Sequence, residues 1–264
     1  MQTPPRISVV IPAYNCADTL ARAVDSAVAG ADYARTAMNL PLHTEIVVVN
    51  GASTDDTAAA IAALDARLAA APHITFKSTF FSPNRGPGPS RNEGVRLASA
   101  PFIAFLDADD EYLPPHLGLC LSALLADRSI GYVWTRRRLD VPVHPSWGPS
   151  LDRSTVMNLC VRRIWHEIAK GFPEHADFLK ISCEDSFYRI VLAALAEGRA
   201  IDEETVLVHF QPGNSLDRQK EKFATPLHDW DGDREIAQPT PAIMSLLEDR
   251  LAYVERLKSE LRGN

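Results

Sequence analysis

The sequence predicts an α/β protein with a mostly parallel central sheet flanked by helices. Short apolar runs of strand length alternate with helix-like segments through the first half of the chain. Such alternation is the pattern of a parallel sheet with right-handed crossover connections. One apolar run, residues 102–106, ends in a cluster of acidic residues. Because open α/β sheets bind ligands at the carboxyl ends of their strands, this cluster also indicates a site.

The elements of the first half follow from the spacing of apolar and turn residues. Residues 7–11 are a β-branched run that Pro12 stops, and residues 17–29 have helical composition. A Ser-Thr-Asp-Asp sequence at 53–56 is typical of a helix start and precedes an alanine-rich helix at 54–71. A Ser-Arg-Asn-Glu sequence at 90–93 resembles a capping box, and prolines 114 and 115 begin a further helix. The other expected strands are residues 45–49, 74–77, 102–106 and 131–135.

The second half is less regular. Residues 155–161 are expected to be a strand, 184–197 a helix, 206–210 a short strand and 137–155 a loop. The polar stretch 211–240 is either a mobile lid or an irregular surface tail. Residues 241–261 are helical, because Leu247, Val254 and Leu261 recur every seven residues. This C-terminal helix is expected to pack on its own domain, with a homodimer through the helix as the alternative.

The composition indicates a globular protein that does not bind nucleic acid. The chain has 264 residues and a formal net charge of −7, which disfavours a nucleic-acid surface. Its single basic triplet, arginines 136–138, is expected to be a solvated strand end. Four scattered cysteines indicate a reduced compartment. No segment has the length of a membrane span and no secretion signal precedes residue 7, so a cytoplasmic protein is expected.

Asp107, Asp109 and Asp110 are the most informative residues of the chain. They follow a short apolar run and would emerge together at the end of a buried strand. Three anions so close raise one another's pKa unless a cation intervenes. Mg²⁺ and Mn²⁺ prefer oxygen ligands, so a divalent cation carried on a phosphate is the expected partner. From these residues alone, the alternative is an acidic turn that caps the next helix.

No glycine-rich phosphate loop accompanies the acidic residues. The loop after the first strand, residues 12–15, contains no glycine, which disfavours a nicotinamide enzyme, and the chain has no P-loop motif. The Gly-Pro-Gly sequence at 86–88 follows a long loop rather than a strand and is a weak phosphate signal. An acidic cluster without a backbone cradle favours a diphosphate bridged by a metal ion.

Several segments, in their order and spacing, resemble the inverting glycosyltransferases of family 2, which have the GT-A fold. Residues 8–15 are similar to the family's opening strand and nucleotide loop, residues 45–57 to its second strand and turn, and residues 84–94 to the segment before the acidic cluster. Residues 107–110, Asp-Ala-Asp-Asp, resemble the D-x-D motif, and Glu184-Asp185 resembles the catalytic pair. The resemblance extends over roughly residues 7–216.

The resemblance implies a metal-dependent enzyme that uses Mn²⁺ or Mg²⁺. It would move a sugar from a nucleoside-diphosphate donor, with a UDP-sugar favoured, to a hydroxyl of a glycan, lipid-linked or other polar acceptor by single displacement. Asp185 would be the general base, with Glu184 orienting it or the acceptor. Asp109 and Asp110 would be the metal candidates. The nucleotide would be bound by Pro12, Ala13, Tyr14, Asn15, Asn50, Ser53, Arg91, Asp107 and Ala108, with Tyr14 against the nucleobase and Asp107 facing the ribose and metal.

Two positions depart from the family's pattern. Asn50 stands where the family usually has an acid that pairs with the base of UDP, which leaves the choice of nucleotide open. Gln211 stands near the position of a common histidine. His209, two residues earlier, either contacts the diphosphate or metal or makes a structural hydrogen bond at a strand end.

The resemblance divides the chain into a nucleotide-sugar-binding half, residues 1–111, an acceptor-binding half of the same domain, residues 112–240, and a C-terminal helix, residues 241–264. Three tryptophans, 134, 147 and 165, would either offer faces for sugar stacking or belong to the core. One alternative is a nucleotidyltransferase, which would be expected to carry a glycine-rich basic loop after the first strand. Another is a non-catalytic nucleotide-sugar-binding module, in which Asp185 would only cap its helix or pair with Arg189.

Overall fold

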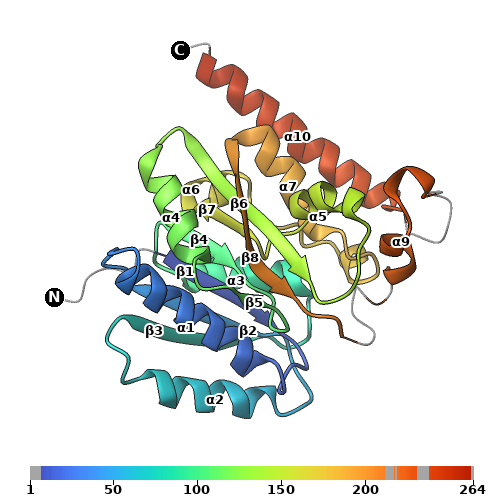
Figure 1. The fold of residues 1–264 in the computed structure, drawn as a ribbon. Helices are drawn as coiled ribbons and strands as arrows, with labels where there is room; N and C mark the ends of the chain where they lie inside the picture. The colour runs from blue at the N-terminus through green and yellow to red at the C-terminus, as the bar shows by residue number, and fades with distance from the viewer. Residues whose placement is uncertain (1–6, 212–216, 218, 231–237, 263–264) are drawn as a thin grey trace.

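The structure is a computed structural model that describes residues 7–211, 217, 219–230 and 238–262. These residues form an eight-stranded sheet with the order β3-β2-β1-β4-β7-β6-β8-β5 (Figure 1). The strands are β1 (Ile7–Ala13), β2 (Thr44–Asn50), β3 (Ile74–Phe80), β4 (Phe102–Phe105), β5 (Glu111–Tyr112), β6 (Ile130–Leu139), β7 (Leu159–Arg162) and β8 (Glu197–Val208).

The sheet is mostly parallel, as predicted. Strands β3, β2, β1 and β4 run parallel to one another. Strand β7 is antiparallel to both of its neighbours, β4 and β6. Strand β8 is parallel to β6, and the two-residue strand β5 pairs with it in the antiparallel sense. The carboxyl ends of β1, β4 and β6 therefore lie along one edge of the sheet.

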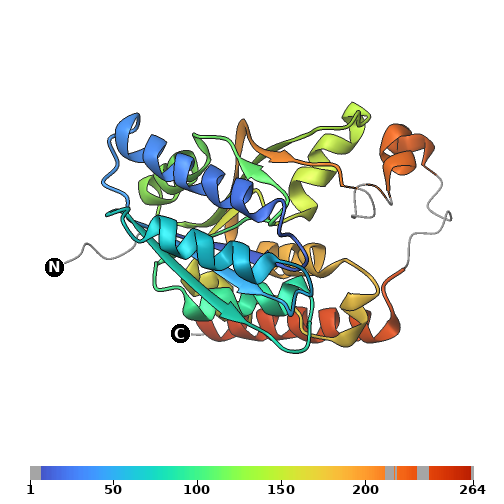
Figure 2. The same ribbon diagram turned by 90° about the horizontal axis from the view of Figure 1, so that it is seen from below.

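Helices cover both faces of the sheet. Helices α1 (Leu20–Thr36), α2 (Thr57–Leu68) and α4 (His116–Ala126) pack on one face, and α3 (Pro87–Leu97), α6 (Arg163–Ile168), α7 (Glu184–Leu195) and α10 (Pro241–Arg262) on the other. Figure 2 shows α1 and α10 at opposite sides of the molecule. Two short helices, α5 (Gly148–Ser154) and α9 (Lys220–Ala224), stand near the end of β6.

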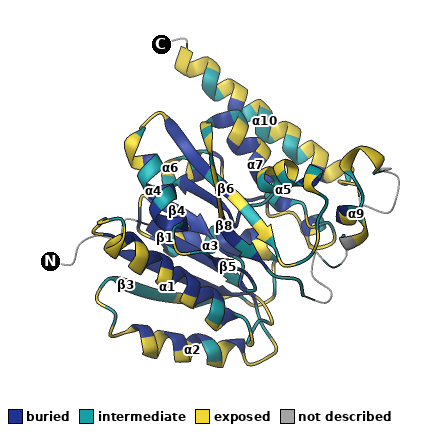
Figure 3. Cartoon of the chain, in the orientation of Figure 1, coloured by how far each residue is buried: buried dark blue, intermediate teal, exposed yellow. Residues whose placement is uncertain are grey.

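The apolar strands supply a core to each helical layer. In β1, Val9 and Ile11 pack with the α1 side, whereas Val10 packs with the α3 side. A strand buried on both faces reads as a continuous apolar run, which explains why the strands were recognisable in the sequence. Figure 3 shows the central strands β1 and β4 dark and buried, while the outer surface of α10 is exposed.

Several predicted boundaries were wrong for local reasons. Helix α2 begins at Thr57 rather than residue 54, because the Asp55 carboxylate accepts hydrogen bonds from the Thr57 hydroxyl (2.6 Å) and N–H (3.1 Å). Helix α3 begins at Pro87, so Ser90 lies inside its first turn and donates to the Gly86 carbonyl (2.9 Å) instead of forming a capping box. Strands β6 and β8 are longer than predicted, and the expected loop 137–155 contains the end of β6 and all of α5.

Helix α10 packs on its own domain, as predicted. It lies against α7 through the buried side chains of Ile243 and Val254, whereas Leu261 is 71 % exposed. Self-association through this helix stays a prediction. The four cysteines are free thiols. Among the described residues, no helix combines the length and the apolar character needed to cross a membrane. The expected lid, 211–240, lies partly outside the described residues.

Candidate active site

A cleft of about 970 Å³ opens where β1 and β4 end and extends along the end of β6 and α5. This volume is at the upper end of the range for small-molecule sites. Of the residues predicted for the site, all but Asn50 and Ser53 line this cleft: Pro12, Ala13, Tyr14, Asn15, Arg91, Asp107, Ala108, Asp109, Asp110, Glu184 and Asp185.

Asn50 and Ser53 support the loop at the cleft rather than line it. The side-chain oxygen of Asn50, which is 3 % exposed, accepts a hydrogen bond from the Ser53 N–H (2.9 Å). The Ser53 hydroxyl accepts from the Asn15 N–H (3.0 Å), and the Asn15 side chain accepts from the Thr54 N–H (2.8 Å). Asn15 and Ala52 have positive φ angles of 49° and 65°, so these bonds hold two tight turns together. Tyr14, by contrast, is 52 % exposed at the cleft.

The three aspartates after β4 have different surroundings. Asp110 is 2 % exposed, and its carboxylate accepts from the His209 N–H (3.0 Å). Burial, together with the charges of Asp109 and Asp107, raises the pKa of Asp110 well above its ordinary value. Asp107 is partly exposed and forms an ion pair with Arg91 at 2.6 Å. The ionised form of this cluster therefore calls for additional positive charge.

The acidic residues fit a hard divalent cation. Within residues 7–211 and the later described stretches, no group of three or more His, Cys, Asp or Glu side chains forms a complete metal site. Asp109 and Asp110 nevertheless both line the cleft and offer only oxygen ligands. Mg²⁺ and Mn²⁺ are commonly bound by one or two carboxylates, with phosphate oxygens and water completing the coordination. The donor chemistry and the raised pKa of Asp110 agree with such an ion.

Arg91 joins the acidic cluster to the predicted base. Its side chain, 3 % exposed, rises from α3 and donates to Asp107 and Asp185, both at 2.6 Å, and its guanidinium lies 3.5 Å from Glu184. Burial opposes the charge of Arg91, but Asp185, Asp107 and Glu184 outweigh burial and raise the pKa of Arg91.

Asp185 lies in the first turn of α7, as predicted. Burial raises the pKa of Asp185 to about 7, although the charge of Arg91 opposes the shift. Burial also raises the pKa of Glu184. The ion pair of Asp185 in the structure is with Arg91, whereas Arg189 donates to the Arg153 carbonyl (2.9 Å).

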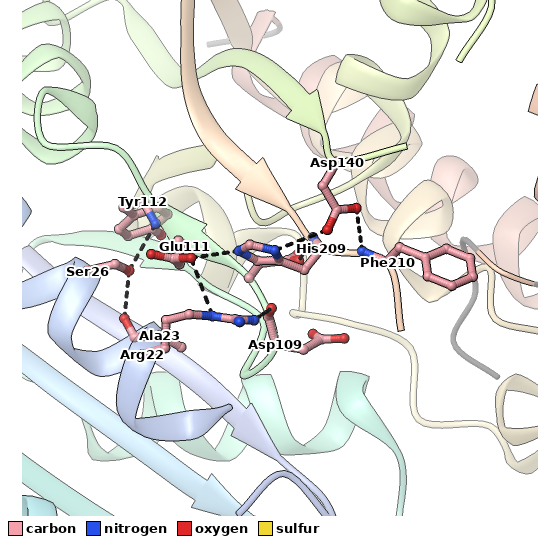
Figure 4. A network of polar contacts seen from close by, with 10 residues as sticks. Arg22, Ala23, Ser26, Asp109, Glu111, Tyr112, Asp140, His209 and Phe210 are labelled. Carbon is pink, nitrogen blue, oxygen red and sulfur yellow. Dashed lines mark hydrogen bonds and ion pairs between the residues drawn. The ribbon is translucent and has the colours of Figure 1, made fainter. Parts of the chain in front are cut away.

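A polar network fastens the acidic cluster to its neighbours (Figure 4). The ring nitrogens of His209 lie 2.6 Å from Glu111 and 3.2 Å from Asp140. Arg22, from α1, forms an ion pair with Glu111 (3.3 Å) and donates to the Asp109 carbonyl (2.7 Å). His209 thus makes structural hydrogen bonds at the end of β8, which is one of the two roles expected from the sequence.

Two cations on the cleft wall were not predicted. Arg136 and Arg138 are exposed, as expected, but the Arg137 side chain is only 4 % exposed and lines the cleft. The alternation of β6 was the missed signal, because Arg137 follows Val133 and Thr135 on the inward face. Lys222, on α9, also lines the cleft, with its ammonium 5.0 Å from the centre of the Trp147 ring. No sequence motif predicted Lys222.

The tryptophans belong to the core more than to the cleft. Trp147 touches the cleft but is 5 % exposed, and its indole N–H donates to the Thr225 carbonyl (2.7 Å). Trp134 stacks on Tyr132 with ring centres 5.7 Å apart. Neither Trp134 nor Trp165 lines the cleft, so of the two expected roles the structure favours packing.

Comparisons with known proteins agree with this geometry. A family model described as glycosyl transferase family 2 matches residues 8–197. Succinoglycan biosynthesis protein ExoU of Rhizobium meliloti is 37% identical over 119 residues, which cover 45% of this chain and 30% of ExoU. Chondroitin synthase of Pasteurella multocida is 34% identical over 134 residues, covering 51% of this chain and 12% of the synthase. The chain thus spans less than a third of these relatives' lengths.

Solved structures share the fold at low sequence identity. S. aureus TarS in complex with UDP-GlcNAc superposes with a TM-score of 0.66 and 18% identity, covering 93% of this chain and 66% of TarS. The mannosyltransferase PcManGT from Pyrobaculum calidifontis, in complex with GDP-Man and Mn2+, gives a TM-score of 0.60 and 22% identity, covering 96% of this chain and 70% of PcManGT.

Proposed function

Because this chain belongs to glycosyl transferase family 2 and is a glycosyltransferase of the GT-A fold, we propose that it moves a sugar from a nucleoside-diphosphate donor to an acceptor hydroxyl with inversion. The observation that carries the proposal is the position of Asp185 in the same cleft as Asp109 and Asp110, joined to their loop through Arg91. Residues 1–111 would bind the donor and residues 112–240 the acceptor, with residues 241–264 as a supporting helix.

The donor would enter at the carboxyl ends of β1 and β4. Tyr14 is exposed at the cleft and offers a ring for stacking on the nucleobase. The structural neighbours bind UDP-GlcNAc and GDP-Man, which supports a nucleotide sugar, and a UDP-sugar is favoured here. The acceptor would be a glycan, a lipid-linked sugar or another polar alcohol, in line with the polysaccharide-forming relatives.

Asp109 and Asp110 would hold a Mn²⁺ or Mg²⁺ ion. The Mn2+ of the PcManGT complex and the oxygen-only donor set support this assignment. When bound, the ion would act as a Lewis acid on the diphosphate and stabilise the charge of the leaving group.

Asp185 would take the proton of the attacking hydroxyl. The acceptor oxygen forms its bond to the anomeric carbon while the bond from that carbon to the phosphate oxygen breaks, and the electron pair leaves with the diphosphate. A carboxyl whose pKa is about 7 is matched to proton abstraction near neutral pH. Arg91 would hold Asp185 in place, and Glu184 would orient the base or the acceptor.

The Asp185→Asn variant tests the proposal. Release of nucleoside diphosphate from UDP- and GDP-sugars, measured with a panel of glycan acceptors, should fall by about 10²- to 10⁴-fold. Binding of UDP or GDP should persist, because asparagine keeps the shape of the aspartate side chain. The matched control is Asp202→Asn, whose carboxylate is 93 % exposed on β8. Normal turnover in Asp185→Asn would exclude the proposed base, and a wild-type protein that binds nucleotide without transfer would indicate a binding module.

A thermal-shift series with UDP and GDP tests the metal. A ligand that binds only the folded protein raises the melting temperature. We expect the shift to be larger with Mn²⁺ than with a chelator, and Asp110→Asn should remove the difference. An equal shift with and without Mn²⁺ would contradict the assignment of Asp109 and Asp110.

A further inference from the structure

Arg137 is a buried cation with almost no partners. Its Nε and Nη2 atoms are buried and make no hydrogen bond within the described part of the chain. The Asp152 carboxylate lies 3.7 Å from Nε, beyond hydrogen-bond distance, and Nη1 donates to the sulfur of Met157, at 3.7 Å. With its side chain 4 % exposed, Arg137 holds these donors out of contact with bulk water.

Buried guanidinium donors without acceptors are energetically unfavourable unless an anion binds to them. A buried donor without an acceptor loses its hydration without compensation, and the loss is larger for a charged group. Burial accordingly lowers the pKa of Arg137. A guanidinium presents five N–H groups in a rigid fork, which matches the oxygen atoms of a phosphate or carboxylate. The Arg137 side chain therefore has N–H donors, unbonded among the described residues, that can bind an anionic ligand.

The sheet places Arg137 near both the acidic cluster and the proposed base. Toward the acidic cluster, Arg137 is in register with Val206 of β8. Val206 in turn pairs with Tyr112 of β5, and Tyr112 follows Asp110 by two residues. Toward the proposed base, Arg137 contacts Met157, and the residue before Met157 donates its N–H to Asp185. The carboxylates that act on Arg137 are, in order, those of Asp152, Asp110, Asp185 and Asp107.

We propose that Arg137, which lines the same cleft as Asp109 and Asp110, binds the phosphate of the donor that carries the sugar. This inference rests on the proposed function, since it takes the donor to be a nucleoside-diphosphate sugar. When the bond between sugar and phosphate breaks, the electron pair stays on the phosphate oxygen. The guanidinium of Arg137 would donate two hydrogen bonds to the phosphate and stabilise its growing negative charge. Because that charge is larger in the transition state than in the ground state, Arg137 would lower the barrier to transfer.

Arg91 is unsuited to this task, although it also lines the cleft. Its guanidinium is already bonded to Asp107 and Asp185 and lies close to Glu184. Any phosphate bound there would have to displace a carboxylate. An anionic group on the acceptor is the competing occupant for Arg137, and the experiment below separates the two.

The test compares nucleoside diphosphates with the matching monophosphates. Dissociation constants of UDP, UMP, GDP and GMP are measured by calorimetry with Mn²⁺ and again with a chelator. In Arg137→Met the preference for diphosphate over monophosphate should fall by about 10- to 100-fold, because a hydrogen-bonded charge contact is lost. Affinity for the monophosphate should stay unchanged. Arg138→Met, an exposed neighbour on the same strand, is the matched control and should keep the wild-type preference.

Each outcome decides a separate point. If wild-type protein shows no preference for diphosphate, the proposed donor class is wrong. If wild type and Arg137→Met show the same preference, the donor class stands and the role of Arg137 is wrong, as it would be if the residue served an anionic acceptor. Should Arg137→Met lack a cooperative melting transition, Arg137→Lys replaces it. Lysine keeps the charge and loses the fork, so the preference should fall by a smaller factor, and an unchanged preference would again overturn the inference.

Discussion

Two buried arginines line one cleft, and their partners differ. Arg91, on α3, is bonded to two carboxylates and lies near a third. Arg137, on β6, has one carboxylate at 3.7 Å and two nitrogens without hydrogen bonds in the described structure. Both side chains are almost fully buried, at 3 % and 4 % exposed. Burial alone therefore does not reveal what a charged residue is for.

The difference separates a structural role from a binding role. A buried charge that the protein itself neutralises holds elements together, and Arg91 joins α3 to the loop after β4 and to α7. A buried charge with donors that the described residues leave unbonded, such as Nε and Nη2 of Arg137, is one that a ligand can complete. Similar reasoning applies to Glu45, where hydrogen bonds from Lys77, Ser8 and Ser99 outweigh burial and lower the pKa to about 2. Like Arg91, Glu45 is satisfied within the protein, and it lies away from the cleft.

The largest expected difference between the arginines is in stability. Arg91→Met should lower the free energy of unfolding by about 3–5 kcal/mol, because it leaves Asp107 and Asp185 without their buried partner. Arg137→Met should change it by less than about 1 kcal/mol, since loss of a weak ion pair is offset by removal of unbonded donors. Urea denaturation of the ligand-free proteins measures both. Equal destabilisation by the two substitutions would mean that Arg91 and Arg137 do not differ in their structural role.

The two arginines should also differ, by a smaller amount than in stability, in their effect on the pH dependence of sugar transfer. Asp185 must be ionised to accept a proton, so kcat/KM should rise with pH and level off above about 7. Arg91 favours the ionised form, and removing its charge in Arg91→Gln should raise the pKa of Asp185 and move the rise upward by about 1 pH unit or more. Arg137→Gln should move it less, because Arg137 does not touch Asp185. The pH profiles of kcat/KM are measured at a temperature at which both variants are folded. A larger shift in Arg137→Gln than in Arg91→Gln would show that Arg91 is not the main charge acting on Asp185.

The smallest expected effect concerns Asp152. In Asp152→Asn the carboxylate that competes for the Arg137 guanidinium is lost, while the side-chain oxygen can still accept the Arg137 backbone N–H (3.0 Å in the native protein). We expect the affinity for UDP or GDP to rise by about 2- to 5-fold, the size of a weak ion pair. Calorimetry on the Asp152→Asn protein with a chelator present would measure this gain. A loss of affinity would mean that Asp152 positions Arg137 for its ligand.

The sequence revealed those parts of the site that depend on short-range patterns. The acidic residues end an apolar run, and Asp185 stands at the start of an amphipathic helix, so both could be placed on their elements. The order of these segments identified the family. The mostly parallel sheet followed from the same alternation, although the antiparallel strands β5 and β7 did not, because strand direction depends on pairing far along the chain.

What the sequence concealed depends on long-range packing. Arg137 stands in a triplet of identical residues, and only the path of β6 past Thr135 shows that the middle one points inward. The raised pKa of Asp185 has the same origin, because the elements that bury this carboxyl are distant in the sequence. The partners of His209 lie 69 and 98 residues away, so no local pattern could have joined them.

The network around His209 has a practical consequence for protein engineering. Acceptor specificity in such enzymes invites chimaeras, in which the chain after β8 is exchanged for that of a relative. In this protein His209 stands at that junction and donates its N–H to Asp110. Its ring also contacts the Glu111 carboxylate, which forms an ion pair with Arg22. A crossover placed before His209 would therefore disturb the loop that carries Asp109 and Asp110. Crossovers beyond Phe210, with Asp140 retained, would leave these contacts in place.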